Sequence, residues 1–164
     1  MTWRGTATPT DRIFGILPYL LPLSDAVFSG GAFFRYVEQF PPLIPVAEAI
    51  RVLALPAVLI QGLIPFGSLV IFMLLIFLVV RNPRIGHFIR FNTLQAILIG
   101  FIIFVCSLLI GVFETPSLSL LTETLSNVVF LGGLGMVLYS MVQSGLGRYA
   151  EIPTISEAVH MQVR

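Results

Sequence analysis

The sequence predicts an all-α integral membrane protein, namely a four-helix bundle with a short interfacial amphipathic helix between the first and second spans. Composition supports this prediction, because 57% of the 164 residues are hydrophobic and only 10% are charged. Soluble domains carry roughly 25% charged residues. The chain also contains four long stretches with at most one charge each. A helix needs roughly 20 apolar residues to cross a bilayer, and each stretch is long enough.

The expected spans lie within one membrane domain that covers residues 1–164, at about 13–32, 62–80, 92–113 and 122–144. The first is apolar apart from Asp25, the third is uncharged, and the fourth is uncharged from Thr124 onward. The second ends an uncharged run from Val52 to Val80. Because proline is tolerated in the first turn of a helix, we expect this span to begin near Pro65.

A connection of about 30 residues, positions 33–63, separates the first two spans and is rich in phenylalanine and proline. Within it, the stretch from Val46 to Leu55 carries Glu48 and Arg51 three positions apart. This spacing favours an ion pair on a short amphipathic helix that lies on the membrane surface. Such a helix would be either a packed connector or a surface that binds a partner.

Positive charges set the expected orientation, because basic loops stay on the cytoplasmic side of a membrane. With both terminal tails in the cytoplasm, only Arg35 and Arg51 lie outside. The seven arginines inside are Arg4, Arg12, Arg81, Arg84, Arg90, Arg148 and Arg164. Three of them surround His87 in the loop before the third span. We expect Arg81, Arg84, His87 and Arg90 to fix the topology and to contact anionic lipids of the inner leaflet.

Stripes of small residues on the third and fourth spans would let helix backbones approach closely in lipid. They consist of Ala96, Gly100, Ser107 and Gly111 on the third span, and of Gly133, Ser140 and Ser144 on the fourth. We expect these faces to pack the two helices against each other. The alternative is the seam of a homo-oligomer.

Three polar side chains in the spans are candidates for function. Asn92 and Gln95 share one face at the cytoplasmic start of the third span, where they either serve helix packing or line a polar entrance. Asp25 is the only acidic residue in the first span. Deep in a membrane it would be a functional site, because a charge is costly there. The prolines and glycines around it favour instead an outer interfacial position beside Arg35 or Arg51.

Signatures of catalysis, metal binding and nucleic-acid binding are missing from the sequence, and no cofactor is expected. Cys106 is the single cysteine and lies within the third span, so it forms neither a disulfide nor a cysteine cluster. His87 and His160 stand far apart without the spacing of metal ligands. The net charge of +1 predicts no basic surface for nucleic acid.

Several segments, in their order along the chain, together resemble the Tic20 family. They are Asp11–Phe14, Leu17–Leu23, Ile64–Gly67, Val80–Arg84 and His87–Ala96. The most specific part is Arg-Asn-Pro-Arg at positions 81–84 followed by Arg-Phe-Asn-Thr-Leu-Gln-Ala at positions 90–96. The resemblance covers roughly residues 11–143.

The resemblance implies a non-enzymatic four-helix membrane protein with both termini on the stromal or cytoplasmic side. It also implies a part in protein translocation or in assembly of a membrane complex. The expected partners are membrane lipids, other membrane subunits or further copies of the chain, and a translocating polypeptide. Two other functions stay open: an ion- or solute-coupled transporter that uses Asp25, and a scaffold that binds partner subunits through the outer connection.

Residue usage points to a cyanobacterial member of this family. All nine basic residues are arginine, a bias that suits a GC-rich bacterial genome. The segment before the first span is also too short for an organelle transit peptide. We therefore expect an integral protein of the cytoplasmic membrane of a cyanobacterium, with the thylakoid membrane as the alternative.

Overall fold

The computed structural model describes residues 7–163, which form helices and turns without a β-strand. The first helical stretch comprises α1 (Pro9–Ile16), a 3-10 turn (Leu17–Tyr19) and α2 (Leu20–Ser29). A capping box opens it. The Asp11 amide donates to the Thr8 hydroxyl at 3.2 Å, and the Thr8 amide donates to the Asp11 carboxylate at 2.9 Å. The backbone amides of Thr8 and Asp11, which have no partner within the helix, each find an acceptor in this way, and the helix start is fixed.

The chain turns sharply after α2, and α3 (Gly31–Val37) leaves at an angle of 70°. Gly30 stands at this elbow because α7 passes very close to it. A Cβ at Gly30 would lie 2.6 Å from the ring of Phe130, closer than carbon atoms approach. The rings of Phe33 and Phe34 have their centroids 4.8 Å and 5.2 Å from that of Phe130. Aromatic packing therefore holds the elbow onto α7.

The next two helices differ from the sequence prediction. A 3-10 turn (Pro41–Leu43) leads into α4 (Ile44–Gly62), and α5 (Gly67–Leu74) continues as a π-helical turn (Leu75–Val80). The predicted short amphipathic helix is in fact 19 residues long, and Pro41–Gly62 passes the length and hydropathy test for a span. The predicted second span does not, because Gly67–Val80 is a shorter apolar helix. At 1.5 Å per residue it covers about 21 Å, less than the ~30 Å hydrocarbon core.

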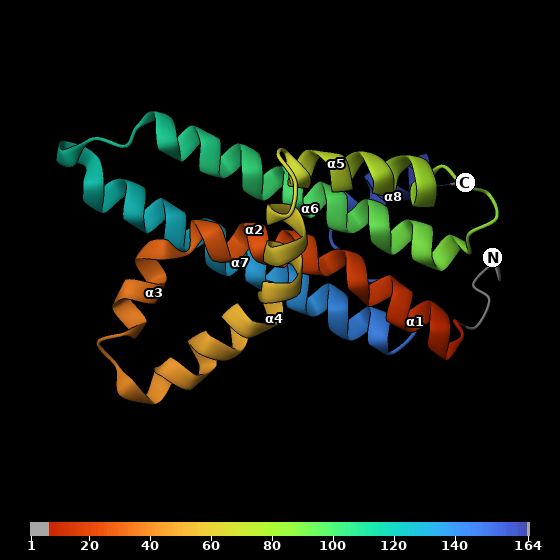
Figure 1. Ribbon diagram of the computed structural model, residues 1–164, viewed down its shortest axis with the longest axis horizontal. Helices are drawn as coiled ribbons and strands as arrows, with labels where there is room; N and C mark the ends of the chain where they lie inside the picture. Colours follow the sequence, from red (N-terminus) through yellow and green to blue (C-terminus); the bar gives the residue numbers. More distant parts are fainter. Residues whose placement is uncertain (1–6, 164) are drawn as a thin grey trace.

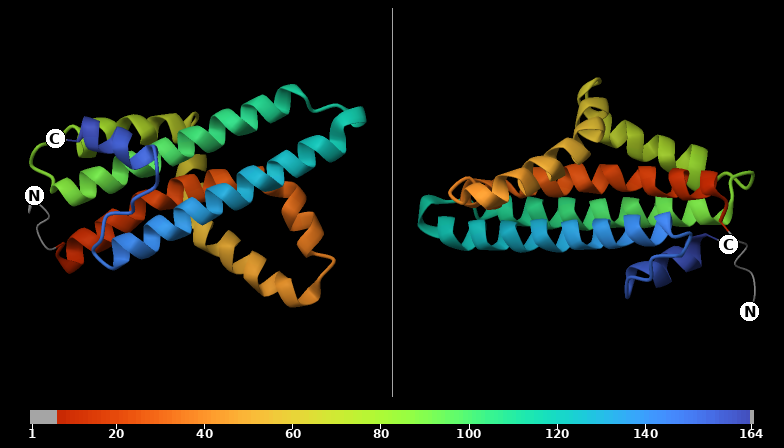
Figure 2. Two further views of the ribbon diagram at one scale, coloured as in Figure 1. Left: turned by 180° about the vertical axis from the view of Figure 1, so that it is seen from behind. Right: turned by 90° about the horizontal axis from the view of Figure 1, so that it is seen from below.

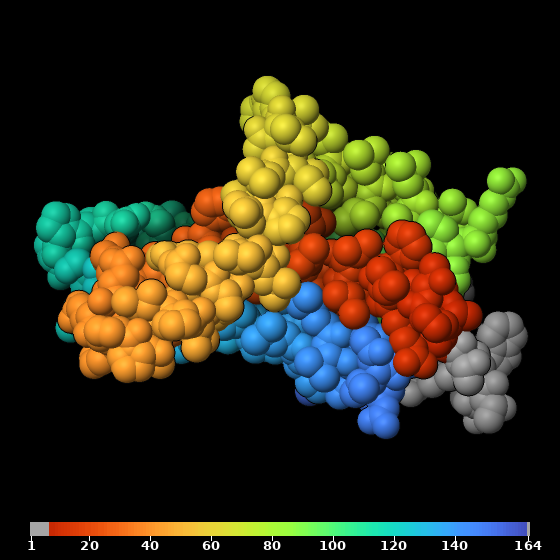
Figure 3. Space-filling view, turned by 60° about the horizontal axis from the view of Figure 1, so that its bottom comes forward, coloured from red at the N-terminus to blue at the C-terminus, as the bar shows by residue number. Residues whose placement is uncertain are grey.

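The break between α4 and α5 follows from backbone conformation. Phe66 has a φ of 57°, in the left-handed region, which ends the helical path. A Cβ at Gly67 would lie 2.0 Å from the carbonyl oxygen of Gln61, so only glycine fits this turn. The turn carries strongly exposed apolar side chains, Leu63 at 78% and Phe66 at 82%. It stands out from the rest of the surface in Figure 3.

The two longest helices are α6 (His87–Val112) and α7 (Ser119–Gly145), joined through a short 3-10 turn (Pro116–Leu118). They agree with the predicted spans 92–113 and 122–144 but begin earlier. The end of α7 is closed by the Gly147 amide bonding to the Ser144 carbonyl at 2.9 Å and the Arg148 amide bonding to the Gln143 carbonyl at 2.9 Å. Gly147 has a φ of 74°, the left-handed conformation that such a cap requires.

The α1–α2 stretch lies over α6 and α7, and these helices form the body of the molecule (Figure 1). The right panel of Figure 2 shows α5 on one side of this body and α8 on the other. The core between the helices is filled by large side chains without exposed area. They include Tyr19, Leu23, Phe91, Ile99, Phe130 and Val137.

The described residues therefore contain three helices that are long and apolar enough to cross a membrane, or four if the bent pair Pro9–Ser29 and Gly31–Val37 counts as one span. The all-α class is confirmed for residues 7–163. The predicted four-helix bundle is confirmed only as an all-α fold with three or four helices of spanning length. The helix α4, expected to be short, is long enough to span, whereas α5, expected to span, is too short.

The segment after α7 folds back as α8 (Ile155–Gln162) along α6. Val159 has no exposed area, and the ring centroid of His160 lies 4.7 Å from that of Phe91. The hydropathy of this segment indicates only a polar tail. Its packing depends on aromatic side chains that α6 presents to it.

Candidate functional site

A buried polar junction lies where the 3-10 turn after α1 meets α6 and α7. Tyr19, Asn92 and Gln95 have no exposed area there. The Tyr19 hydroxyl lies 2.9 Å from Oδ1 of Asn92 and 3.0 Å from Oε1 of Gln95. A hydroxyl has one hydrogen, so it donates to one of them at a time. The Ser144 hydroxyl also donates to Asn92 Oδ1 at 2.6 Å, so donation from Tyr19 to Gln95 gives each of the two amide oxygens a donor.

The amide nitrogens of the same two residues fasten other parts of the chain. Asn92 Nδ2 donates to the Phe88 carbonyl at 2.8 Å, one turn earlier in α6. Gln95 Nε2 donates to the Ala150 carbonyl at 2.9 Å, in the segment between α7 and α8. The Ser156 hydroxyl, on α8, donates to the same carbonyl at 3.0 Å. The junction therefore joins five parts of the chain through hydrogen bonds in the interior, namely the 3-10 turn, α6, α7, the segment after α7, and α8.

This geometry bears on the polar entrance expected from the sequence. The structure brings Asn92 and Gln95 together on one face of α6, but it leaves neither side chain exposed. In this conformation both side chains bond to groups in the interior, and the polar entrance stays a prediction. Sequence reasoning missed Tyr19 and Ser156. A signal existed for Tyr19, because a tyrosine in an apolar span needs a partner for its hydroxyl.

The basic turn before α6 is held by local contacts and by the end of the chain. His87 Nε2 lies 3.0 Å from the Val163 carbonyl, and Nδ1 lies 3.0 Å from the Tyr149 hydroxyl. Since a carbonyl only accepts, Nε2 carries a hydrogen. Arg90 donates through Nε to the Val80 carbonyl at 2.8 Å. His87 thus fastens the C-terminal segment to α6, a contact that the sequence did not indicate.

The two remaining arginines of this turn, Arg81 and Arg84, are exposed. The guanidinium of Arg81 lies 5.9 Å from the ring centroid of Phe77. The backbone amide of Arg84 donates to the side chain of Asn82 at 3.0 Å, which shapes the turn. Contact of these two side chains with anionic lipids stays a prediction. Arg4 and Arg164 lie outside the described residues.

The small residues divide into two groups. Ala96, Gly133, Ser140 and Ser144 are buried. A Cβ at Gly133 would lie 2.8 Å from Cδ1 of Ile103, so glycine lets α7 approach α6 closely. Gly100 is covered by α2 instead, because its Cβ position lies 3.1 Å from an Asp25 oxygen. Ser107 and Gly111 line a cleft at the end of α6.

Asp25 faces the middle of α6. Gly100, its neighbour, is 13 residues after His87, the first residue of α6, or about 20 Å along the helix. The predicted neighbours of Asp25 are engaged elsewhere: Arg35 pairs with Glu123 at 2.8 Å, and Arg51 pairs with Glu48 at 2.8 Å. Within residues 7–163, no hydrogen bond or ion pair of the Asp25 carboxylate is found.

A short polar chain next to Asp25 attaches the α4–α5 turn to α2. Gln61 Nε2 donates to the Ser24 hydroxyl at 2.9 Å, and the Ser68 hydroxyl donates to Gln61 Oε1 at 2.7 Å. Ser24 has no exposed area and donates to the Leu21 carbonyl at 2.7 Å. The broken helix pair is thus held against α2 by polar contacts that run from the exposed Ser68 to the buried Ser24.

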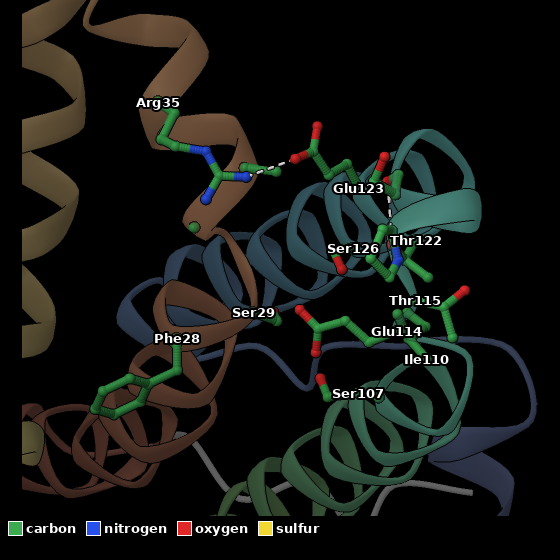
Figure 4. Close-up of a pocket in the computed structure, with 15 residues that line it drawn as sticks. Phe28, Ser29, Arg35, Ser107, Ile110, Glu114, Thr115, Thr122, Glu123 and Ser126 are labelled. Atoms are coloured by element: carbon green, nitrogen blue, oxygen red, sulfur yellow. Dashed lines mark hydrogen bonds and ion pairs between the residues drawn. The ribbon is translucent and has the colours of Figure 1, made fainter.

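A polar cleft of about 550 Å³ opens at the other end of the body (Figure 4). It lies between the α2–α3 elbow, the end of α6 and the start of α7. Its lining includes six residues with hydroxyl groups and three charged residues, which are Ser29, Ser107, Thr115, Ser119, Thr122 and Ser126, and Arg35, Glu114 and Glu123. The sequence did not single out this cleft, because its walls come from three separate segments.

Metal binding finds no support in the described part of the chain, where no group of three or more His, Cys, Asp or Glu could hold an ion. The described residues form an all-α protein that contains helices long enough to span a membrane. Comparison with known sequences makes this class more specific. The family model described as "Chloroplast import apparatus Tic20-like" matches residues 8–159. The chain belongs to the Tic20 family.

Its relatives come from cyanobacteria, red algae and plants. A Tic20 family protein of Synechocystis sp. is 44% identical over 166 residues, covering 100% of this chain and 99% of the relative. The Tic20 family protein Ycf60 of Gracilaria tenuistipitata is 34% identical, covering 95% of this chain and 76% of the relative. Protein TIC 20-v, chloroplastic, of Arabidopsis thaliana is 31% identical, covering 94% and 71%. The resemblance found in the sequence is therefore confirmed.

Proposed function

We infer that this chain is a multi-pass membrane protein, a non-enzymatic component of a machinery that translocates proteins or assembles a membrane complex. The observation that carries this inference is the family match over residues 8–159, whose description names a chloroplast import apparatus. Three helices of spanning length, or four with the bent pair, support the membrane location. The family and the residue usage favour the cytoplasmic membrane of a cyanobacterium, with the thylakoid membrane as the alternative.

The arrangement of the arginines supports the orientation with both tails in the cytoplasm. Figure 1 shows the start of α1, the turn at 81–86 and the end of α7 at one end of the body. The turn between α6 and α7 lies at the opposite end. Arg81 and Arg84 therefore gather at the first end, as the rule for basic loops requires of the cytoplasmic side. Arg35 belongs to α3, beyond the elbow toward the second end.

Chemical labelling tests this orientation. In a Cys106→Ser background, Arg84→Cys and Thr115→Cys each place one cysteine at one end of the body. We expect a membrane-impermeant maleimide to label Thr115→Cys in intact cells and to label Arg84→Cys only after the membrane is opened. Labelling of Arg84→Cys in intact cells would overturn the orientation.

The packed interior limits how the chain could conduct a polypeptide. Tyr19, Ile99 and Phe130 have no exposed area and occupy the space between the helices, so side chains fill the interior. One copy thus offers no wide aqueous path, and a polypeptide would pass between several copies or beside other subunits. A polar entrance at Asn92 and Gln95 would require the hydrogen bonds of the buried junction to open.

Depletion of the chain tests the translocation role. Cells with lowered amounts of the protein should pass a reporter protein across the membrane more slowly, and the chain purified in mild detergent should elute with membrane subunits. The matched control is re-expression of the natural sequence. Unchanged passage of the reporter, together with elution of the chain alone, would contradict the proposal.

Asp25 favours one second candidate function, an ion- or solute-coupled transporter. The carboxylate faces the middle of α6 without a bonded partner in the described residues, and an ionisable group at such depth is costly unless it is used. Asp25→Asn keeps the size and removes the charge. Transport by reconstituted protein that depends on a proton gradient and is lost in Asp25→Asn would favour the transporter, whereas unchanged activity would exclude this role.

A further inference from the structure

We propose that the polar cleft between α2, α6 and α7 binds a primary ammonium group of a polypeptide, either a lysine side chain or an amino terminus. This proposal rests on the proposed function, because a translocation component meets polypeptides. The proposed site lies at the end of the body opposite the turn at residues 81–86. The geometry, the charges and the size of the cleft each support it.

The geometry gathers acceptors from three segments around one space. Figure 4 shows Glu114 extending from the end of α6 toward Ser29 and Ser107, with Ser126 of α7 on the opposite wall. An ammonium group carries three hydrogens and accepts none. A carboxylate oxygen and two hydroxyl oxygens are the set of acceptors that would satisfy it.

The charges in the cleft leave one carboxylate available. Arg35 and Glu123 form an ion pair at 2.8 Å on the rim, so their charges offset each other. The carboxylate of Glu114 has no hydrogen bond or ion pair with any residue in the described range 7–163. The cleft therefore has a net charge of −1 from these three residues, and a cation would be attracted to it. A hydrogen bond between ions is about twice as strong as a neutral one.

The size and lining of the cleft favour an organic group over a bare ion. Its volume of about 550 Å³ falls in the range of ligand pockets, roughly 300–1,000 Å³. Large apolar side chains contribute little to the wall, since only Phe28 and Ile110 are of this kind. The carboxylate and hydroxyl groups among the lining residues suit a polypeptide segment that presents a lysine.

Zero-length coupling tests the proposal directly. A carbodiimide joins a carboxylate to an amine without a spacer, and an amine that is bound beside the carboxylate couples faster than one that reaches it by diffusion. Because all nine basic residues of the chain are arginine, its own side chains supply no competing lysine. The probe is a short peptide, blocked at both ends, with a single lysine. We expect mass spectrometry to find it on Glu114 about tenfold more than on Glu48, the reference carboxylate on α4.

Variants and competitors make the result decisive. Glu114→Gln should abolish the coupling at this site, and Glu48→Gln should not change it. Glu123→Gln leaves Arg35 without its partner, and the added positive charge should lower coupling at Glu114 severalfold. Methylammonium should compete, and the same peptide with acetyl-lysine should not.

Three results would overturn the assignment. One is coupling at Glu114 that does not exceed coupling at Glu48. Another is competition by acetyl-lysine peptide equal to that of the lysine peptide. The third is complete displacement of the peptide by vesicles of phosphatidylethanolamine but not of phosphatidylcholine, which would assign the cleft to a lipid headgroup. The coupling requires no translocation, so the proposed function can fail while this binding stands.

Discussion

The hydroxyl of Tyr19 lies 3.0 Å from the amide oxygen of Gln95, which is 76 residues further along the chain. Gln95 in turn donates to the Ala150 carbonyl, so a single side chain connects the first helical stretch to the segment before α8. Each of these groups is buried, and a buried polar group without a partner costs free energy. The stability of the junction therefore depends on all its members.

Tyr19→Phe should lower the free energy of unfolding by about 1 kcal/mol, the usual range for a hydrogen bond inside a membrane protein. The change keeps the ring but leaves Gln95 without its donor. Thermal unfolding in detergent measures the loss. Tyr139→Phe on α7, which is 42% exposed, is the matched control. An equal loss in both variants would show that the hydroxyl of Tyr19 is not specially important.

Gly133→Leu should destabilise the protein by roughly 1–3 kcal/mol, because extra atoms force apart packed helices. The new side chain would begin 2.8 Å from Ile103. The same change at Gly132 meets no atom within 4 Å and should be nearly neutral. Unfolding of both variants in the same detergent gives the comparison. Equal stability of the Gly133→Leu and Gly132→Leu variants would contradict the close approach of α7 to α6 at Gly133.

Gly67→Ala should disrupt the turn between α4 and α5 at a cost of roughly 1–3 kcal/mol. The added methyl group would overlap the carbonyl of Gln61, at 2.0 Å, and backbone cannot move aside as a side chain can. Gly62→Ala, one turn earlier, has open space around it and serves as the control. Limited proteolysis should cut the Gly67→Ala variant faster at residues 63–66. Identical cleavage rates would contradict the tight turn.

His87→Ala should loosen α8, because His87 Nε2 donates to the Val163 carbonyl and Nδ1 bonds to Tyr149. Hydrogen exchange of the amides at 155–162 should become about tenfold faster, as expected for the loss of about 1.4 kcal/mol. Arg84→Ala, in the same turn but exposed, is the control. Unchanged exchange in α8 would show that its apolar contacts alone hold it.

The strongest sequence predictions concerned α6 and α7. Their uncharged runs exceed the thickness of a bilayer, and such a run has few alternatives to a helix. The uncharged run from Val52 to Val80 was different, because hydropathy does not say where one helix ends. The break was fixed by the left-handed conformation of Phe66 and the contact of Gly67 with Gln61, both of which require the folded chain.

Polar sites were harder to predict than helices, because their neighbours come from distant segments. Spacing placed Asn92 and Gln95 on one face but did not reveal that Tyr19 would cover them. The prolines before Asp25 suggested an early end of the helix, yet the chain passes Pro22 within α2 and ends the helix at Ser29. This brings Asp25 against Gly100.

By itself, the sequence determined the helical class, the family and the two longest helices, because hydropathy and a few specific motifs are properties of local stretches. The tertiary structure alone decided which of α4 and α5 reaches spanning length, which part of α6 Asp25 faces, and which groups bond to Tyr19, Asn92 and Gln95. It also formed the cleft around Glu114. Each of these features is a contact between segments far apart in the chain, and only folding brings such segments together.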